Sequence, residues 1–170
     1  MSISQSDNFS IWRVFRNSNF SSKTALAIST WFGTGLLPGI PGTFGTIAAV
    51  PLVFGLAYLE LGTTALIIAI LIVVAILASG RSKELLGHDD PSAVVIDEVA
   101  GFLLTMFLLP PSWLTLGIGF ILFRAFDILK PYPIRQMERV RGGAGIVLDD
   151  LIAGIYANVC LRLMLRLIEC

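Results

Sequence analysis

The sequence predicts an all-α fold: a membrane-embedded helical bundle of about four to five hydrophobic helices, with its polar motifs gathered on the cytoplasmic side. Composition indicates the membrane, because 55% of the residues are hydrophobic and only 14% are charged, whereas soluble domains carry roughly 25% charged residues. Mean hydropathy is +0.83. A membrane crossing uses about 20 residues plus a connection, so the 170 residues fit one domain, 1–170.

Five apolar stretches separated by turn residues predict the helices of this bundle, over residues 44–61, 62–80, 99–109, 113–123 and 146–168. In the first stretch, Pro51 predicts a kink or a late helix start. The second is unbroken and about as long as a hydrocarbon core is thick. The third and fourth are shorter than a full span and flank a Pro-Pro-Ser turn, so they either tilt or form a shallow helical hairpin.

Residues 1–23 precede the helical core, which we place at 24–170. They lack the short apolar core and the small-residue cleavage site of a secretory signal, and they contain Arg13, Arg16 and Lys23. Apolar residues alternate with the two arginines, as they would in a helix lying on a membrane surface. We therefore expect either an interfacial helix or a disordered tail.

Lys and Arg in short loops predict the orientation of the bundle, because they favour the cytoplasmic side. With four crossings before the last helix, the basic segments fall on one side, and the loops on the other side are nearly uncharged. Three polar motifs, at 33–46, 88–98 and 123–150, then meet at the cytoplasmic boundary. Arg162 and Arg166 disagree with this arrangement, so either they snorkel or the last helix does not cross fully.

Charge and cysteine content exclude several partners. The formal net charge is zero and the pI is about 6.6, and no basic and aromatic stripe is present, so no nucleic acid is expected. Cys160 and Cys170 form no CxxC pair and are interpreted as buried or incidental thiols.

The first motif, FGTGLLPGIPGTFGT at 32–46, combines flexible glycines with the hydroxyls of Thr34, Thr43 and Thr46. Glycine-rich turns just before a helix offer N–H groups to phosphate oxygens. No Lys follows the last glycine, so the motif is not a Walker A loop. A membrane-interface loop with helix caps is an equal alternative.

The second motif, HDDPSAVVIDEVAG at 88–101, holds five side chains that could bind a metal or transfer protons. On a helix starting near Pro91, Asp97 and Glu98 point about 100° apart, so one can face a metal while the other supports it. The residues at 88–90 fit equally well a solvated turn with a helix cap.

In the third motif, Arg124, Asp127 and Lys130 follow one another at intervals of three and share one helical face, ahead of Pro131. They form either an intrahelical salt-bridge ladder or a site in which the carboxylate holds a metal and the cations neutralise phosphate oxygens. The later arginines fit anionic lipid head groups or the positive-inside rule; they are Arg135, Arg139 and Arg141.

A glycine-rich run leads into Asp149 and Asp150 at the mouth of the last apolar helix. The helix dipole stabilises adjacent acids there, yet two acids at a membrane boundary still need a cation. Hard oxygen ligands without a cluster of Cys or His favour Mg²⁺.

The strings FGTGLLPGIPGTFGT, GHDDPSAVVIDEVAG and FRAFDILKPYPIR followed by GGAGIVLDDLIAG, in this order, resemble the phosphatidylglycerophosphatase A family over about residues 31–154. The resemblance implies an all-helical protein of the bacterial inner membrane. With the apolar stretches and the Lys and Arg distribution, we expect a multi-pass protein whose active site faces the cytoplasm. The resemblance further implies Mg²⁺-dependent hydrolysis of phosphatidylglycerophosphate to phosphatidylglycerol and phosphate.

The family pattern, carried over position by position, gives three sets of candidates. The catalytic candidates are His88, Asp89, Arg124 and Lys130. The substrate-binding candidates are Gly35, Gly42, Thr43, Gly45, Thr46 and Arg135. The metal-binding candidates are Asp97, Glu98, Asp127, Asp149 and Asp150.

The expected mechanism uses these sets on a phospholipid partner in the membrane. The acids hold one or two Mg²⁺ ions against the terminal phosphate, and Arg124 and Lys130 clamp that phosphate. His88 or Asp89 protonates the departing glycerol oxygen. Direct attack by water is preferred to an Asp phosphoenzyme, because no DxDx-type motif is present.

Two other classes fit parts of the pattern. A cation channel or transporter also buries acids in a membrane, but it would spread them along a pore reaching both faces. A phosphatidyl-group transferase would also use Mg²⁺ and clustered acids. Its expected pattern, several Asp at helical spacing after an Asp-Gly, is absent.

Overall fold

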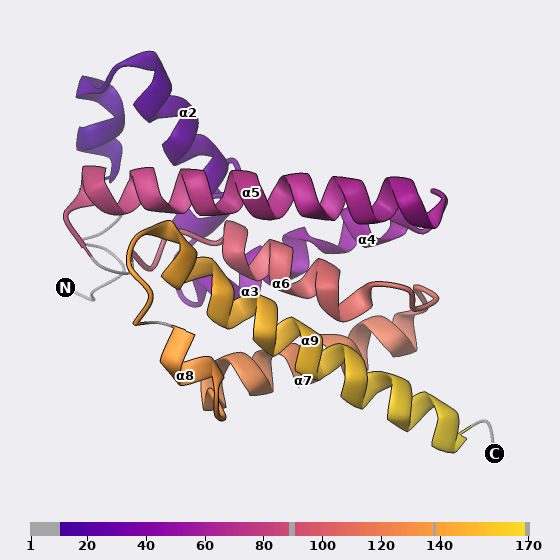
Figure 1. Cartoon of the computed structure of the whole chain (residues 1–170). Coiled ribbons are helices and arrows are strands. Elements are labelled where there is room, and N and C mark those ends of the chain that lie inside the picture. Colours follow the sequence, from indigo (N-terminus) through magenta and orange to yellow (C-terminus); the bar gives the residue numbers. More distant parts are fainter. Residues whose placement is uncertain (1–10, 89–90, 138, 169–170) are drawn as a thin grey trace.

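The computed structural model describes residues 11–88, 91–137 and 139–168, and the regular structure in these ranges is entirely helical (Figure 1). The first half contains helical residues 11–17, α2 (Phe20–Ser29), the 3₁₀ helix η1 (Thr34–Leu36), α3 (Pro41–Ala48), α4 (Val50–Leu56) and α5 (Leu61–Leu86). The second half contains α6 (Ile96–Met106), α7 (Trp113–Leu129), α8 (Ile134–Met137) and α9 (Gly143–Ile168). The all-α prediction is confirmed for the described residues.

Two helices in the described ranges are long and apolar enough to cross a membrane: α5 and the Gly143–Leu167 part of α9. Each helix has 26 residues and extends about 39 Å, more than the roughly 30 Å of a hydrocarbon core. The remaining apolar helices are shorter, with 11 residues in α6 and 17 in α7. The bundle therefore combines two long helices with several short ones.

The predicted helix at 44–61 is two helices in the structure. α3 begins at Pro41, since a proline in the first turn of a helix has no N–H that needs a partner there. The two helices meet at Ala49, and Pro51 lies in the first turn of α4. The helical run begins at Pro41, and Ala49 keeps a helical φ of −76° and ψ of −21° while its N–H donates to the carbonyl of Gly45. The late start is therefore not found, and the break beside Pro51 fits the kink.

The helix that carries the second motif begins at Ile96, so the prediction of a start near Pro91 is wrong. The segment ahead of it is held by α2, because the N–H of Val95 donates to the carbonyl of Ser29 at 2.9 Å. Ala93 and Val94 are also buried, and they pack into the bundle instead of extending the helix. Asp97 and Glu98 consequently lie in the first turn of α6.

Other helix ends also differ from the prediction. α5 continues six residues past the predicted end at residue 80 and stops at Gly87, which adopts the left-handed φ of 69° that ends many helices. α7 continues through the third motif to Leu129, and α9 begins at Gly143, three residues before the predicted start.

α6 is the central helix of the bundle and contacts α3, α5, α7 and α9 (Figure 1). Its side chains Val99, Phe102 and Leu103 are buried in the main hydrophobic cluster, with Phe123 of α7 and Leu161 of α9. A helix that is apolar nearly all round is expected to be enclosed by others.

α6 and α9 touch backbone to backbone at two glycines. A Cβ atom on Gly154 of α9 would overlap the carbonyl oxygen of Gly101 in α6. A Cβ atom on Gly101 would lie 2.7 Å from the carbonyl oxygen of Asp150. Neither position can accept a side chain without moving the helices apart, so these glycines bring the acids of the two helices close together.

The polar segments meet at one end of the bundle. α5 and α7 end there, and α6 and α9 begin there, at the left of Figure 1. The connections at the opposite end are the short segments 57–60 and 107–112. The free thiol of Cys160 is half-buried along α9, and Cys170 lies outside the described residues.

Candidate active site

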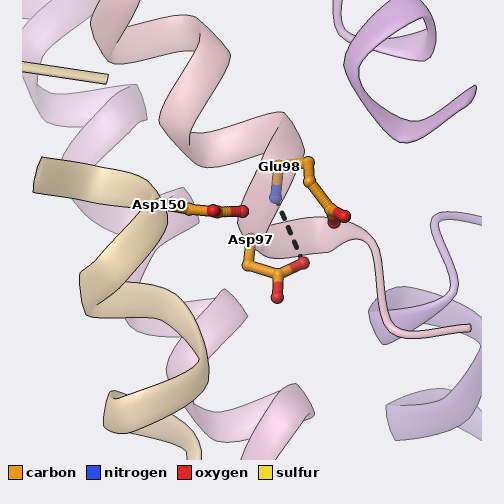
Figure 2. A group of neighbouring side chains, drawn as sticks. All are labelled: Asp97, Glu98 and Asp150. Carbon is orange, nitrogen blue, oxygen red and sulfur yellow. Dashed lines mark hydrogen bonds between the residues drawn. The ribbon is translucent and has the colours of Figure 1, made fainter. Parts of the chain in front are cut away.

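Three carboxylates form a cluster between the first turn of α6 and the third turn of α9 (Figure 2). Asp97 and Glu98 come from α6 and Asp150 from α9, and one oxygen of each lies within 4.8 Å of the others. Asp97 and Asp150 are only 6% and 4% exposed. The N–H of Glu98 donates to Oδ1 of Asp97 at 3.1 Å, and the N-terminus of α6 favours both of its acids.

Two cations lie beside the cluster, each in an ion pair. Nη1 of Arg124 lies 2.7 Å from Oδ2 of Asp127 and 4.0 Å from Oε1 of Glu98. Nζ of Lys130 donates to Oδ2 of Asp149 at 2.8 Å, which joins the end of α7 to α9. Part of the salt-bridge ladder alternative is therefore present, but Lys130 extends it across to another helix.

These seven charged side chains line one cavity with a volume of about 260 Å³. Among the described residues, the lining includes five carboxylates and two cations; its full set is Ile40, Pro41, Gly42, Ser92, Val94, Asp97, Glu98, Arg124, Asp127, Lys130, Ile146, Asp149 and Asp150. The buried carboxylates outnumber the cationic side chains, so they need either protons or a further cation, because charge separated from water is costly.

Two carboxylate oxygens show this need directly. Oε2 of Glu98 and Oδ1 of Asp149 are buried and accept no hydrogen bond from the described part of the chain. Burial raises the pKa of the Glu98 carboxyl, against the lowering effects of its hydrogen bond with Asp97 and of the nearby Arg124 charge. A cation bound among these oxygens would remove the desolvation cost.

The first turn of α3 forms another part of the cavity wall. Gly42 follows Pro41 there, and a Cβ atom at Gly42 would overlap Oε1 of Glu98 and lie 3.0 Å from Nη1 of Arg124. The first N–H groups of a helix have no partner within it and attract anions. Glycine therefore allows this helix start to approach the charged side chains.

Other substrate-binding candidates lie away from the cavity. Gly35 and Gly45 pack closely against Ala93 and Val95, where a side chain would clash. The hydroxyl of Thr46 is fully buried and donates to the carbonyl of Gly42 at 2.8 Å. These residues hold the segment that carries Gly42 in place.

The last candidates are not among the residues that line the cavity. Thr43 is half-buried in α3, and Arg135 is exposed on α8. His88 is exposed just beyond α5, and Asp89 lies outside the described residues. Their predicted roles stay predictions.

Four lining residues were not anticipated: Ile40, Ser92, Val94 and Ile146. Each lies within a few residues of a predicted site residue, so proximity in the sequence was the available signal. Apolar side chains that line a cavity cannot be told from core residues by composition, because both kinds are hydrophobic.

The fold and the site define a class. In the part of the chain that the structure describes, the protein is all-helical, with two potential membrane helices and a buried acidic site flanked by Arg and Lys, an arrangement suited to phosphoryl chemistry. Residues 27–165 match the family description "Phosphatidylglycerophosphatase A". The chain belongs to the phosphatidylglycerophosphatase A family, and it is a membrane-associated lipid phosphatase.

Curated relatives share about a third of the sequence. Phosphatidylglycerophosphatase A of Escherichia coli (strain K12) is 35% identical over 132 residues, or 76% of this chain and 77% of the relative. A Bacteroides thetaiotaomicron protein named "Putative phosphatidylinositol-3-phosphatase" is 36% identical over 141 residues, covering 78% of this chain and 87% of its own. Phosphatidylglycerophosphatase A of Haemophilus influenzae is 35% identical over 135 residues, covering 78% and 83%. No solved structure matches the chain significantly.

Proposed function

We propose that this protein hydrolyses phosphatidylglycerophosphate to phosphatidylglycerol and inorganic phosphate, with Mg²⁺, at the cytoplasmic face of a bacterial inner membrane. The observation that carries the proposal is a single cavity that combines a buried acidic cluster with Arg124 and Lys130. The names of the Escherichia coli and Haemophilus influenzae relatives favour this substrate.

The carboxylates of the cavity fit Mg²⁺. Asp97, Glu98 and Asp150 offer hard oxygen donors within 4.8 Å of one another, and Asp127 and Asp149 lie in the same cavity. Buried oxygens such as Oε2 of Glu98 accept no hydrogen bond from the described residues, which suits a metal ligand. Bound Mg²⁺ would stabilise the negative charge of the phosphoryl group and lower the pKa of a water molecule.

Arg124 and Lys130 bind the phosphate oxygens in this proposal. Asp127 holds the guanidinium of Arg124, and that group has five N–H donors, enough to keep this pair and contact a phosphate. Asp149 holds the ammonium of Lys130. The N-terminal turn of α3 at Gly42 adds N–H groups on the other side of the cavity.

Proton transfer needs an acceptor and a donor. A carboxylate oxygen of the cavity with no hydrogen-bond partner among the described residues, such as Oδ1 of Asp149, can take the proton of the attacking water. His88 or Asp89 is proposed to protonate the departing glycerol oxygen. They precede Ser92 of the cavity lining by a few residues.

In the membrane, α5 and α9 cross the bilayer in this proposal, and the shorter helices complete a multi-pass bundle. Lys83 lies in the last turn of α5 and Arg141 lies in the connection just before α9. α5 ends and α9 begins at the end of the bundle that holds the cavity, which favours a cytoplasmic site. The acyl chains then stay in the leaflet while the head group enters the cavity.

A phosphoinositide is a second candidate substrate, because the Bacteroides thetaiotaomicron relative is named for phosphatidylinositol-3-phosphate chemistry. The channel and transferase alternatives gain no support: the acids of the cavity gather at one end of the bundle, and the family is a phosphatase family.

The test is phosphate release by the purified protein in mixed micelles that contain either lipid. We expect phosphatidylglycerophosphate to be hydrolysed with a kcat/KM at least about tenfold above that for phosphatidylinositol-3-phosphate, a difference of about 1.4 kcal/mol in transition-state binding. EDTA should abolish release, and added Mg²⁺ should restore it. Preference for the phosphoinositide, or full activity in EDTA, would contradict the proposal.

A further inference from the structure

Two polar side chains of α9 lie far from the cavity and contact the end of α6. Nδ2 of Asn158 donates to the carbonyl oxygens of Leu104, Thr105 and Phe107 at 3.2, 2.8 and 2.9 Å. Nη2 of Arg162 donates to the carbonyl of Phe107 at 2.7 Å, and its Nε donates to Oδ1 of Asn158 at 2.8 Å. Arg162 thus contacts Phe107 and Asn158.

The contacts satisfy a need of the short helix α6. α6 ends at the buried Met106, just before the connection 107–112, and the last carbonyl groups of a helix have no partner within it. An unpaired carbonyl in an apolar environment costs several kcal/mol. A guanidinium also interacts favourably with the negative end of the helix dipole.

The same two helices carry the acidic cluster, and the contacts between them repeat at four-residue intervals. The α9 row is Asp150, Gly154, Asn158 and Arg162. The α6 row is Asp97, Gly101 and Thr105. Asp150 meets Asp97, Gly154 meets Gly101, and Asn158 meets Thr105, as expected where rows of residues four apart pack together.

We infer that Asn158 and Arg162 form a clamp that fixes the position of α6 along α9 and thereby sets the spacing between Asp150 and the acids of α6. Asn158 is eight residues from Asp150, about 12 Å along the helix, so the clamp residues are positioning residues. The glycine contact alone leaves the helices free to slide, since it offers no directional bond. A slip of one residue would move the ligands by about 1.5 Å, a large change for a cluster whose ligand atoms lie within 4.8 Å of one another.

The inference rests on the proposed metal site, and Mn²⁺ binding tests it without turnover. Free Mn²⁺ is measured by electron paramagnetic resonance in titrations of the full-length protein in detergent. We expect Asn158→Leu and Arg162→Met each to raise the Mn²⁺ Kd about tenfold, the scale of losing a group that supports metal ligands. The double variant should weaken binding little further, because the two side chains act as one unit.

Arg166→Met is the matched control, because Arg166 is an exposed arginine one turn further along α9, and its Mn²⁺ Kd should stay within about twofold of the wild type. Thermal unfolding in EDTA checks that each variant is folded. If Arg162→Met does not fold, Arg162→Lys is measured in its place. Lysine keeps the positive charge but cannot bond both Asn158 and the carbonyl of Phe107 as Arg162 does. It should weaken Mn²⁺ binding, by less than tenfold.

Unchanged Mn²⁺ affinity in folded Asn158 and Arg162 variants, with only a lower Tm, would overturn the clamp. A wild-type protein that binds Mn²⁺ but releases no phosphate from either lipid would contradict the proposed reaction, and the Mn²⁺ comparison would still decide the clamp. Failure of the wild type to bind Mn²⁺ would overturn both.

Discussion

α5 and α9 have the same length of 26 residues and both could span a membrane, yet they differ in what they contact. The most apolar 18-residue stretch of α5 has a mean hydropathy of 2.9, and 17% of it is buried inside the protein. The corresponding stretch of α9 has a mean hydropathy of 1.6, and 50% of it is buried. α9 also carries two buried acids and the clamp residues, while the charges of α5 lie near its C-terminal end. The less apolar of the two helices is therefore the one that builds the site, and α5 forms an outer wall.

The largest contrast is expected between acids of the two helices. Asp150→Asn in α9 removes a charge from the cluster and should lower phosphate release on the order of 1,000-fold. Glu84→Gln in α5 changes an exposed acid that pairs with Arg81 and should leave the rate within about twofold. Initial rates at saturating Mg²⁺ give the comparison, and similar losses in both variants would break it.

The cations should show the same contrast at a smaller scale. Lys130→Met removes a proposed phosphate ligand and leaves Asp149 buried beside no ammonium, so kcat/KM should fall about 100-fold. Arg81→Met in α5 removes an exposed ion pair and should change kcat/KM less than about twofold. Wild-type kcat/KM in Lys130→Met would show that Lys130 has only a structural role.

Glycine-to-alanine variants test how closely each of the two helices packs against its neighbours. Gly154→Ala in α9 places a methyl group against the backbone of Gly101, and should destabilise the fold by about 1–3 kcal/mol. Gly62→Ala in α5 meets no atom within 4 Å, and should be neutral or stabilising by up to about 1 kcal/mol. Unfolding in one detergent measures both, and an equal Tm for the two variants would refute the close α6 and α9 contact.

The smallest effects should occur where both helices face outward. Ile70 of α5 and Ile155 of α9 are 55% and 49% exposed, so Ile70→Ala and Ile155→Ala remove few internal contacts. We expect activity within about twofold of the wild type for each. A large loss in Ile70→Ala alone would reveal a role for the α5 surface that its exposure does not predict.

Much of the site could be predicted from the sequence, because charge is rare in this chain. An ionisable residue between apolar stretches is costly unless it has a partner. This cost, with the family resemblance, pointed to Asp97, Glu98, Asp127 and the pair at 149–150. The structure brings these acids into one cavity with Arg124 and Lys130. Short helices that return the chain to the same end of the bundle explain why these acids lie together.

Other features depended on packing that no local pattern records. The start of α6 at Ile96 is set by a hydrogen bond from Val95 to Ser29 of a distant helix. Thr46 has the hydroxyl that a phosphate site would use, but the structure buries it in a bond to Gly42. The contacts of Asn158 could not be predicted, since its partners are backbone carbonyls that carry no signal in the sequence.

The position of Mn²⁺ in a crystal of the full-length protein tests the proposed metal site most directly. Anomalous diffraction should show an ion bound to carboxylate oxygens of Asp97, Glu98 and Asp150, with bound phosphate between it and the side chains of Arg124 and Lys130. An ion bound elsewhere, in a protein that hydrolyses phosphatidylglycerophosphate at full rate with Asp97→Asn, Glu98→Gln and Asp150→Asn combined, would contradict the assignment of this cavity as the active site.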